Sequence, residues 1–191
     1  LTNLAIIYGS LGSYEEAIKI YYEQLDIAKT QKDDKNAALI YYNIGKTYFE
    51  IGEHQKALIN FKESTKLREL LKDELNTGSC YAAQASVYEK MDSLNLASKM
   101  YDKTLAIYTR IDDKNHLATL HHNIAYLNIR MGNYGKVIEN ALISIEYLDE
   151  IGLEVDKIDS YLDLSYAYKE LRDLEKSELF LEKAQTLLEE T

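Results

Sequence analysis

Apolar side chains recur along this chain at intervals of three and four residues, in segments that stop and restart. One such segment runs from residue 41 to residue 51, and its apolar and small positions fall on one face of a helix. They are Tyr41, Ile44, Gly45, Tyr48 and Ile51. After Gly52 the pattern restarts in residues 57–61. Two helices joined by a short turn are therefore predicted for this part of the chain.

The same pattern repeats at a fixed interval of 40 residues, without a gap. Three columns of matched residues show the period. They are Gly12, Gly52, Asp92, Gly132 and Arg172; Tyr8, Tyr48, Tyr88, Asn128 and Tyr168; and Ala5, Gly45, Ala85, Ala125 and Ser165. A fixed period of this size indicates stacked supersecondary units. We expect one domain, residues 1–191, built of five units at about 1–34, 35–74, 75–114, 115–154 and 155–191.

Each unit is predicted to be a helical hairpin, which gives an all-α fold of ten helices. The expected ranges are 1–12, 14–31, 35–52, 54–72, 75–92, 94–111, 115–132, 134–151, 155–171 and 174–189. Gly12 and Gly52 suit the turns because glycine adopts the left-handed conformation in which helices end. Ser13, which follows the first turn, is the expected N-cap of the next helix and forms a capping box with Glu16.

Small residues in two columns are expected to let the paired helices approach closely, with Tyr and Leu side chains filling the space between neighbouring hairpins. The first column contains Ala5, Gly45, Ala85 and Ala125, and the second contains Ala17, Ala57 and Ala97.

Composition and charge narrow the class of protein. The chain has no proline and only 8 glycines, which favours helices over a β-sandwich or a βαβ enzyme. Its formal charge of −10 disfavours nonspecific binding to nucleic acid or to anionic lipid. No apolar run is long enough to span a bilayer, and no signal peptide is visible. Since the first residue is Leu1 rather than methionine, we expect a fragment of a longer protein; its compartment, cytoplasmic or periplasmic, is left open.

The repeat resembles the tetratricopeptide repeat (TPR) family, whose pattern is a bulky residue, Leu-Gly-x-x-Tyr and then Ala-x-x-x-Phe. Here it reads Tyr41, Ile44-Gly45, Tyr48, Ala57 and Phe61. The resemblance covers essentially the whole chain, although the period is 40 rather than about 34 residues and the closing proline is absent. It implies a right-handed superhelical solenoid of about five hairpins. TPR variants with this longer period are typical of some cell-polarity adaptors and of bacterial sensor kinases and transcription regulators.

Side chains capable of chemistry do not form a recognisable catalytic or metal site. His121 occupies the bulky packing position of its unit, and His116 and His122 are six residues apart and so do not share a helical face well. A single cysteine, Cys80, excludes an intramolecular disulfide and is expected to be a structural thiol. The chain also lacks a glycine-rich phosphate loop, a nucleophile elbow and a zinc signature. We therefore predict a protein that is not an enzyme, with no cofactor and no metal.

In TPR arrays the first helix of each unit lines a concave surface that binds extended peptides or partner helices. On the helix near residues 39–50 the face opposite the packed positions contains Leu39, Tyr42, Asn43, Lys46, Phe49 and Glu50. The third unit has Ser79, Ala82, Ala83, Ser86, Glu89 and Lys90 there; the fourth has Thr119, His122, Asn123, Tyr126, Ile129 and Arg130; the fifth has Asp159, Leu162, Asp163, Tyr166, Lys169 and Glu170. The small residues of the third unit could leave a pocket. Tyr42 and Phe49 either line a groove or cover a neighbour.

Asparagine recurs at one position of this face, as Asn3, Asn43 and Asn123. A carboxamide donates and accepts at once, which matches the backbone of an extended ligand, and TPR proteins use asparagine there in that way. The predicted ligand-binding residues are Asn3, Tyr42, Asn43, Lys46, Phe49, Ser86, His122, Asn123, Tyr126, Arg130 and Tyr166. The basic residues of a dicarboxylate clamp are absent around Asn43 and Asn123.

The partner is expected to be a protein or peptide that is neutral or basic. Residues 1–118 contain 17 acidic and 15 basic residues, a net charge of −2, whereas residues 119–191 contain 15 and 7, a net charge of −8. The leading interpretation is the sensing or docking part of a bacterial signalling or transcription-regulatory protein. Two alternatives stay open: a structural array that self-associates through its ends, where Leu1 and Leu187 lie near the chain termini, and a receptor for a short signalling peptide.

Overall fold

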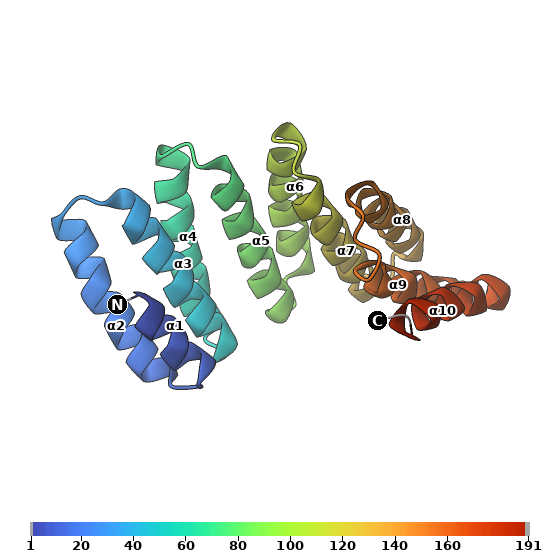
Figure 1. Ribbon diagram of the computed structural model, residues 1–191, viewed down its shortest axis with the longest axis horizontal. Coiled ribbons are helices and arrows are strands. Elements are labelled where there is room, and N and C mark those ends of the chain that lie inside the picture. The colour runs from blue at the N-terminus through green and yellow to red at the C-terminus, as the bar shows by residue number, and fades with distance from the viewer. Residues whose placement is uncertain (1, 190–191) are drawn as a thin grey trace. The chain divides into compact units, whose positions relative to one another are not determined.

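The computed structural model describes the backbone of residues 2–189 and the side chains of these residues other than 2, 3 and 6. Ten α-helices and no strand occur in this part of the chain, so the all-α fold of helical hairpins is confirmed. The first five are α1 (Thr2–Ser10), α2 (Tyr14–Thr30), α3 (Asp34–Glu50), α4 (His54–Leu70) and α5 (Glu74–Lys90). The others are α6 (Leu94–Arg110), α7 (Lys114–Arg130), α8 (Tyr134–Ile151), α9 (Lys157–Glu170) and α10 (Leu174–Glu189). Successive helices run in opposite directions (Figure 1).

Turns between the helices follow a strict spacing of twenty residues. Each contains one residue with positive φ: Gly12, Lys32, Gly52, Lys72, Asp92, Asp112, Gly132, Gly152 or Arg172. The next N–H donates back across the helix end, as from Asp33 to the carbonyl of Ala28 and from Glu53 to that of Tyr48, both at 2.9 Å. The helices before these turns therefore end about two residues earlier than several of the predicted ranges.

One detail of the predicted helix starts is wrong. Ser13 makes no side-chain capping bond, so the expected capping box with Glu16 does not form; its N–H instead donates to the carbonyl of Tyr8. Side-chain caps are found at the start of other helices, where Asp33, Asp73 and Asp113 each accept from the N–H three residues on.

The ninth helix, α9, begins at Lys157, two residues later than predicted. The side chain of Lys157 is buried, and its ammonium group forms ion pairs with Asp149 and Glu154. These contacts fix the turn that precedes the helix. One buried ammonium is thus satisfied by two carboxylates, as a buried charge requires.

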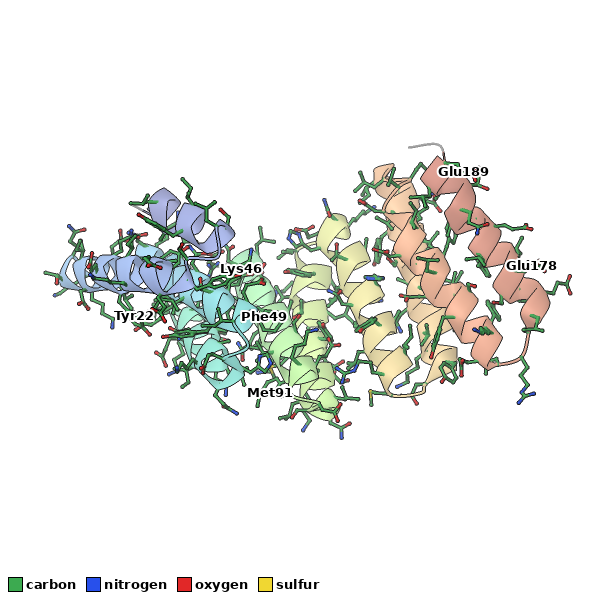
Figure 2. The ribbon with its side chains drawn as sticks, turned by 90° about the horizontal axis from the view of Figure 1, so that it is seen from below. Tyr22, Lys46, Phe49, Met91, Glu178 and Glu189 are labelled. Carbon is green, nitrogen blue, oxygen red and sulfur yellow. The ribbon has the colours of Figure 1, made fainter. Side chains whose placement is uncertain are left out.

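The chain forms two compact units, residues 1–104 and residues 105–191. The expectation of one continuous domain stays a prediction. In the first unit, α1 to α5 pack in sequence order, each against the next. Apolar clusters in its interior are built around Tyr21, Leu25, Ile40 and Ile44 and around Leu58, Phe61 and Val87. Figure 2 shows the side chains that fill the space between neighbouring helices.

Small residues bring the paired helices together as predicted. Ala5, Ala17, Ala57, Ala85, Ala97 and Ala125 are all fully buried. At Gly45, a Cβ would lie 2.8 Å from two ring carbons of Phe61, which is closer than a real contact. The α3–α4 approach therefore depends on glycine at this position.

The second unit repeats this arrangement in α7 to α10. Its apolar cluster is formed by Ala125, Val137, Ala141, Leu164 and Ala167. Phe180 of α10 closes one side, where its ring stacks on that of Tyr168 with centroids 5.6 Å apart.

A buried hydroxyl links the two helices of a hairpin in both units, and the sequence analysis did not identify it. Ser64 donates to the carbonyl of Ala38 (2.7 Å), and Ser144 donates to that of Ala118 (2.9 Å), so the same bond recurs after two periods. Thr104 occupies the intervening position and lies 3.4 Å from the carbonyl of Gly78. Each hydroxyl thus has a backbone carbonyl as its hydrogen-bond partner inside an otherwise apolar interface.

None of the helices in residues 2–189 combines the length and the hydrophobicity that crossing a membrane would require.

Candidate functional site

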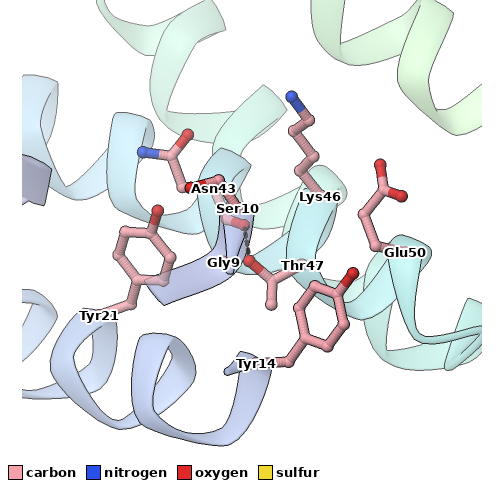
Figure 3. A pocket seen from close by; sticks show the side chains of 8 residues that line it. All are labelled: Gly9, Ser10, Tyr14, Tyr21, Asn43, Lys46, Thr47 and Glu50. Carbon is pink, nitrogen blue, oxygen red and sulfur yellow. Dashed lines mark hydrogen bonds between the residues drawn. The ribbon is translucent and has the colours of Figure 1, made fainter. Parts of the chain in front are cut away.

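A pocket of about 400 Å³ lies on the first unit at the predicted asparagine position. Asn43, Lys46, Thr47 and Glu50 of α3 form one wall, at spacings of three and four residues. Tyr14 and Tyr21 of α2 and the α1 residues Gly9 and Ser10 complete the lining. Figure 3 shows these side chains around the cavity. The pocket therefore joins helices from the first two hairpins.

Hydrogen bonding inside the pocket leaves the Asn43 carboxamide available. Thr47 satisfies its hydroxyl by donating to the backbone carbonyl of Asn43 (2.9 Å), and Ser10 donates to the carbonyl of Ile7 (2.8 Å). The side chain of Asn43 makes no hydrogen bond to another residue of the described part of the chain, and it is half-buried. Lys46 and Glu50 are exposed and supply one charge of each sign. The pocket thus presents a free donor–acceptor group between charges of opposite sign.

Tyr42 is not on the free face, and this part of the prediction is wrong. Its ring packs on Phe61, with centroids 5.4 Å apart, and the guanidinium of Arg68 lies 5.5 Å from its centroid. Burial raises the pKa of its hydroxyl. Phe49 also packs against the cluster of Leu58, Phe61 and Val87 rather than standing free. These two aromatic residues cover a neighbouring helix, which is the second of the two options that the sequence left open.

In the second unit, His122 lies beside Asp163. His122 Nδ1 of α7 is 3.2 Å from Asp163 Oδ2 of α9. This interaction raises the pKa of the imidazole, and burial opposes the rise without cancelling it. Asp163 is buried, so the prediction that placed it on an open face is wrong. A pocket of about 240 Å³ next to His122 is lined by Thr119 and Asp159 among others.

The remaining predicted residues of the second unit are accessible to differing degrees. Tyr126 is 51% exposed and Tyr166 is 43% exposed, with the Tyr166 ring 6.3 Å from that of Tyr134. Asn123 is half-buried on α7, one residue after His122, and Arg130 is exposed near the end of the same helix. The two exposed tyrosines lie on α7 and α9, which contact each other directly. Tyr126 lies one helical turn after His122 on α7.

Two predicted positions of the first unit contribute less. Ser86 is half-buried and donates to the carbonyl of Ala82 (3.3 Å). Glu89, expected on the same face, is buried and accepts from the hydroxyl of Tyr101 (2.6 Å). Asn3 lies outside the described side chains.

Sequence reasoning missed part of the first pocket. Tyr14, Tyr21 and Ser10 were not predicted, because they come from α1 and α2 and reach the pocket only through the packing of the first hairpin against α3. Thr47 was also missed; it lies four residues after Asn43, and this helical spacing was the available signal.

Two other side chains of potentially reactive type, a histidine and the cysteine, are buried and have structural contacts. His121 is buried, as predicted, and its Nδ1 lies 2.9 Å from the side-chain oxygen of Asn140. Cys80 is fully buried and donates to Ser64 Oγ at 3.3 Å, and burial raises the pKa of its thiol. No group of three or more His, Cys, Asp or Glu side chains in the described residues is arranged to hold a metal ion.

Comparisons with known proteins identify the family. Two sequence models described as tetratricopeptide repeat match residues 1–69 and 158–187, which together make up just over half of the chain. A relative, "Protein KINESIN LIGHT CHAIN-RELATED 2" of Arabidopsis thaliana, is 24% identical over 95% of this chain. The chain spans 29% of that relative's length. The chain belongs to the tetratricopeptide repeat family.

Solved structures share the fold. BtubC (BKLC) from P. vanneervenii aligns with a TM-score of 0.89 at 18% identity, over 96% of this chain and 76% of that one. A Signal Transduction ATPase with Numerous Domains (STAND) protein with a tetratricopeptide repeat sensor, from Pyrococcus horikoshii, aligns with a TM-score of 0.84 at 25% identity. That alignment covers 97% of this chain and 28% of the STAND protein. The tetratricopeptide repeat fold is a protein–protein interaction module.

Proposed function

We propose that this chain is a peptide-binding module that is not an enzyme, and that the Asn43 pocket contacts the backbone of an extended ligand. The observation that carries the proposal is the carboxamide of Asn43 in a cavity of about 400 Å³, where no described residue forms a hydrogen bond with it. An amide that both donates and accepts fits the N–H and C=O of one peptide unit. Lys46 and Glu50, which flank it, favour polar or zwitterionic segments over purely apolar ones.

The second unit has a surface of its own that could contact a ligand in this proposal, and it is aromatic and acidic. Tyr126 and Tyr166 offer exposed rings of the kind that anchor bound segments. Asp159 at the neighbouring pocket, together with the net charge of −8 of residues 119–191, favours a neutral or basic partner. Nucleic acid is disfavoured by the same charge.

The larger protein in which such a module works is proposed to be a bacterial signalling or transcription-regulatory protein, with this chain as the sensing or docking part. The similarity to a STAND protein whose repeats are described as its sensor supports the sensing role in that assignment. A receptor for a short signalling peptide is a narrower form of the same proposal.

A structural role is the second candidate, and one observation favours it. Leu174 and Leu181 are exposed, one heptad apart on α10. The residue one period before Leu181 is Ala141, which is buried against the next helix. A surface of this kind would support self-association through the ends of the array.

The test begins with peptides displayed from a random library and selected on the whole chain. Amide chemical shifts of the chain are then followed while a selected peptide is added. The proposal expects perturbations that concentrate in α1 and α3, around Asn43 and Lys46, and a peptide that uses the second unit's own surface should perturb α7 and α9, around Tyr126 and Tyr166. Perturbations confined to α10, or to the second helices of the hairpins, would overturn it and support the structural role.

A further inference from the structure

The same position recurs near the end of the second helix of every hairpin. It is charged in the second hairpin and apolar in the others. Its occupants are Ala28, Arg68, Tyr108, Leu148 and Leu188, one period apart. Ala28, Tyr108 and Leu148 are buried core residues. Arg68 is buried to the same degree, with 6% of its surface exposed. The chain therefore keeps a guanidinium in a site that accepts an apolar side chain elsewhere.

Protein contacts satisfy only part of this guanidinium. Its Nε donates to Ser64 Oγ (3.0 Å), and the ring of Tyr42 lies 5.5 Å from its carbon Cζ. The nearest carboxylate, Asp73 Oδ2, is 3.8 Å from Nη1, which is too far for a hydrogen bond. The guanidinium has five N–H donors, and the two terminal nitrogens make no hydrogen bond to the described residues. Asp73 therefore pairs with the guanidinium only through this long ion pair, and the terminal N–H groups keep the capacity to donate to a further group.

Arg68 borders a cavity of about 310 Å³ between α3, α4 and α5. Lys35 and Asn36 of α3 and Asn76 of α5 line it, so the first turns of two helices face the same space. Leu39 and Leu71 add an apolar wall, and both are partly exposed. Helix N-termini favour negative charge through their free N–H groups and their dipoles. The cavity thus combines a guanidinium, two helix N-termini and an apolar wall.

Two carboxylates also face the cavity, and both are engaged. Asp33 accepts from the N–H of Asn36 (3.0 Å) as the N-cap of α3. Asp73 caps α5 and accepts from the side-chain amide of Asn76 at 2.9 Å and 3.0 Å. With Arg68 and the exposed Lys35, the charged groups around the cavity balance. Arg68 and Lys35 supply the donors, while Asp33 and Asp73 are acceptors that already cap the two helices.

The pocket beside His122 provides an internal comparison, because it lies two periods further along the chain. There Leu148 takes the place of Arg68, and Asn115 takes the place of Lys35. Asp156 replaces Asn76, and Asp159 is added. The same cavity in the same fold is therefore without cationic lysine or arginine in one unit and contains two such residues in the other. The difference in charge comes from the side chains and not from the repeat geometry.

We propose that the Arg68 cavity binds a carboxylate, with the guanidinium as its partner and the Leu39–Leu71 wall contacting an attached apolar group. Terminal nitrogens of an arginine hold a carboxylate in a bidentate pair. The carboxylate is that of a peptide C-terminus or of an acidic side chain. This site is separate from the Asn43 pocket, shares no lining residue with it, and does not depend on the groove proposal.

The test uses the arginine side-chain N–H signals of the whole chain in NMR spectra. The chain has four arginines, so the Nε–Hε region contains few signals and Arg68 is assigned by its loss in Arg68→Leu. The probe is 4-methylpentanoate, and its uncharged counterpart 4-methylpentanamide is the control ligand. We expect the Arg68 signal to shift saturably with the carboxylate and not with the amide.

Variants separate the site from general charge effects. Leucine already occupies the equivalent position at residue 148, so Arg68→Leu should fold, and far-ultraviolet circular dichroism verifies this. It should weaken carboxylate binding, measured on the amide signals of Asn36 and Asn76, by roughly ten- to hundredfold. Lys99→Leu removes a positive charge from an exposed position of the same unit and should leave binding unchanged.

Three short peptides then distinguish the two sources of the carboxylate. An N-acetylated Ala-Leu dipeptide with a free C-terminus is compared with its amide and with an N-acetylated, amidated Leu-Glu dipeptide. Binding of the first alone assigns a C-terminus, and binding of the third assigns a side chain. The proposal is overturned if the carboxylate probe leaves the Arg68 signal unchanged, or if it shifts the signal of exposed Arg172 equally.

Discussion

The α carbon of Gly45 lies against the ring of Phe61, so closely that a Cβ there would be 2.8 Å from the ring carbons Cδ1 and Cε1. Phe61 is itself buried in the α4 interface and contacts Tyr42. The ring has no free space to move into without disturbing that contact. The hairpin of α3 and α4 is therefore built on the absence of a single methyl group.

Gly45→Ala should destabilise the protein by about 1–3 kcal/mol, because overpacking forces the ring and the backbone to shift. Urea unfolding followed by circular dichroism measures the change. Gly135→Ala is the matched control, since Gly135 is also helical but has no atom near its missing Cβ. That substitution should stabilise the protein by up to about 1 kcal/mol through helix propensity. Equal and small effects at the two sites would contradict the close α3–α4 approach.

Tyr42→Ala should reduce the free energy of unfolding by about 3–5 kcal/mol, as truncations of large packed side chains do. The reason is its contact with Phe61 and Arg68. Tyr126→Ala, at an exposed position, should change it by no more than about 0.5 kcal/mol. If the two substitutions proved equally mild in urea unfolding, Tyr42 would belong on the open face after all.

Periodicity alone was sufficient to predict the hairpins, because a period of 40 residues repeats the same small and bulky positions and leaves few ways to pack them. It also identified Gly45 as a point of close approach. Periodicity could not show whether Tyr42 is exposed or packed, because the residue lies on the side of α3 away from Ile44. Only the position of the α4 helix shows that Phe61 and Arg68 contact it.

The candidate site was predictable to a similar extent. Asn43 and Lys46 followed from helical spacing on one element. Tyr14 and Tyr21 did not, because their place in the pocket depends on how α2 packs against α3. Asp163 was assigned to the open face by its position on the helix, yet it is buried, and a histidine on a helix in contact with its own compensates that burial. Such pairs form between neighbouring hairpins, and no pattern within one hairpin reveals them.

Cys80 should not react with an aromatic disulfide reagent while the protein is folded. The thiolate is the reactive form, and burial both raises the pKa of this thiol and blocks access to it. The reaction, followed by absorbance, should become fast only in urea concentrations that unfold the first unit. Stoichiometric labelling in the absence of denaturant, at a rate typical of a free thiol, would show that the α4–α5 interface opens readily.

The His122–Asp163 pair should make stability depend on pH in a defined direction. The folded-state pKa of His122 is raised above its ordinary value of 6.5. The folded protein therefore binds this proton more tightly than the unfolded chain. The stabilisation is fully present below 6.5 and is lost as the pH rises through the folded-state pKa. Urea unfolding of the unmodified chain and of His122→Gln, compared between about pH 5.5 and about pH 8.5, measures it.

The stability difference between these two proteins should be largest at the acid end of that range. The Asp163→Asn variant supplies the matched control, because it should lower the titration midpoint of the His122 ring protons toward the ordinary value. Asp159 also contributes to the raised pKa, so part of the shift should remain. A stability difference that is flat across the range would contradict the ion pair.

The most direct test of the proposed function is the affinity of the Asn43→Ala variant for a peptide selected on the unmodified chain. Calorimetry gives the dissociation constants of both proteins and of Asn95→Ala, an exposed asparagine on α6 that serves as the control. The proposal predicts that Asn43→Ala weakens binding by about ten- to hundredfold, since a peptide group loses its hydrogen-bond partner, while Asn95→Ala and the stability of both variants stay unchanged. Equal affinity of the unmodified chain and Asn43→Ala would contradict it.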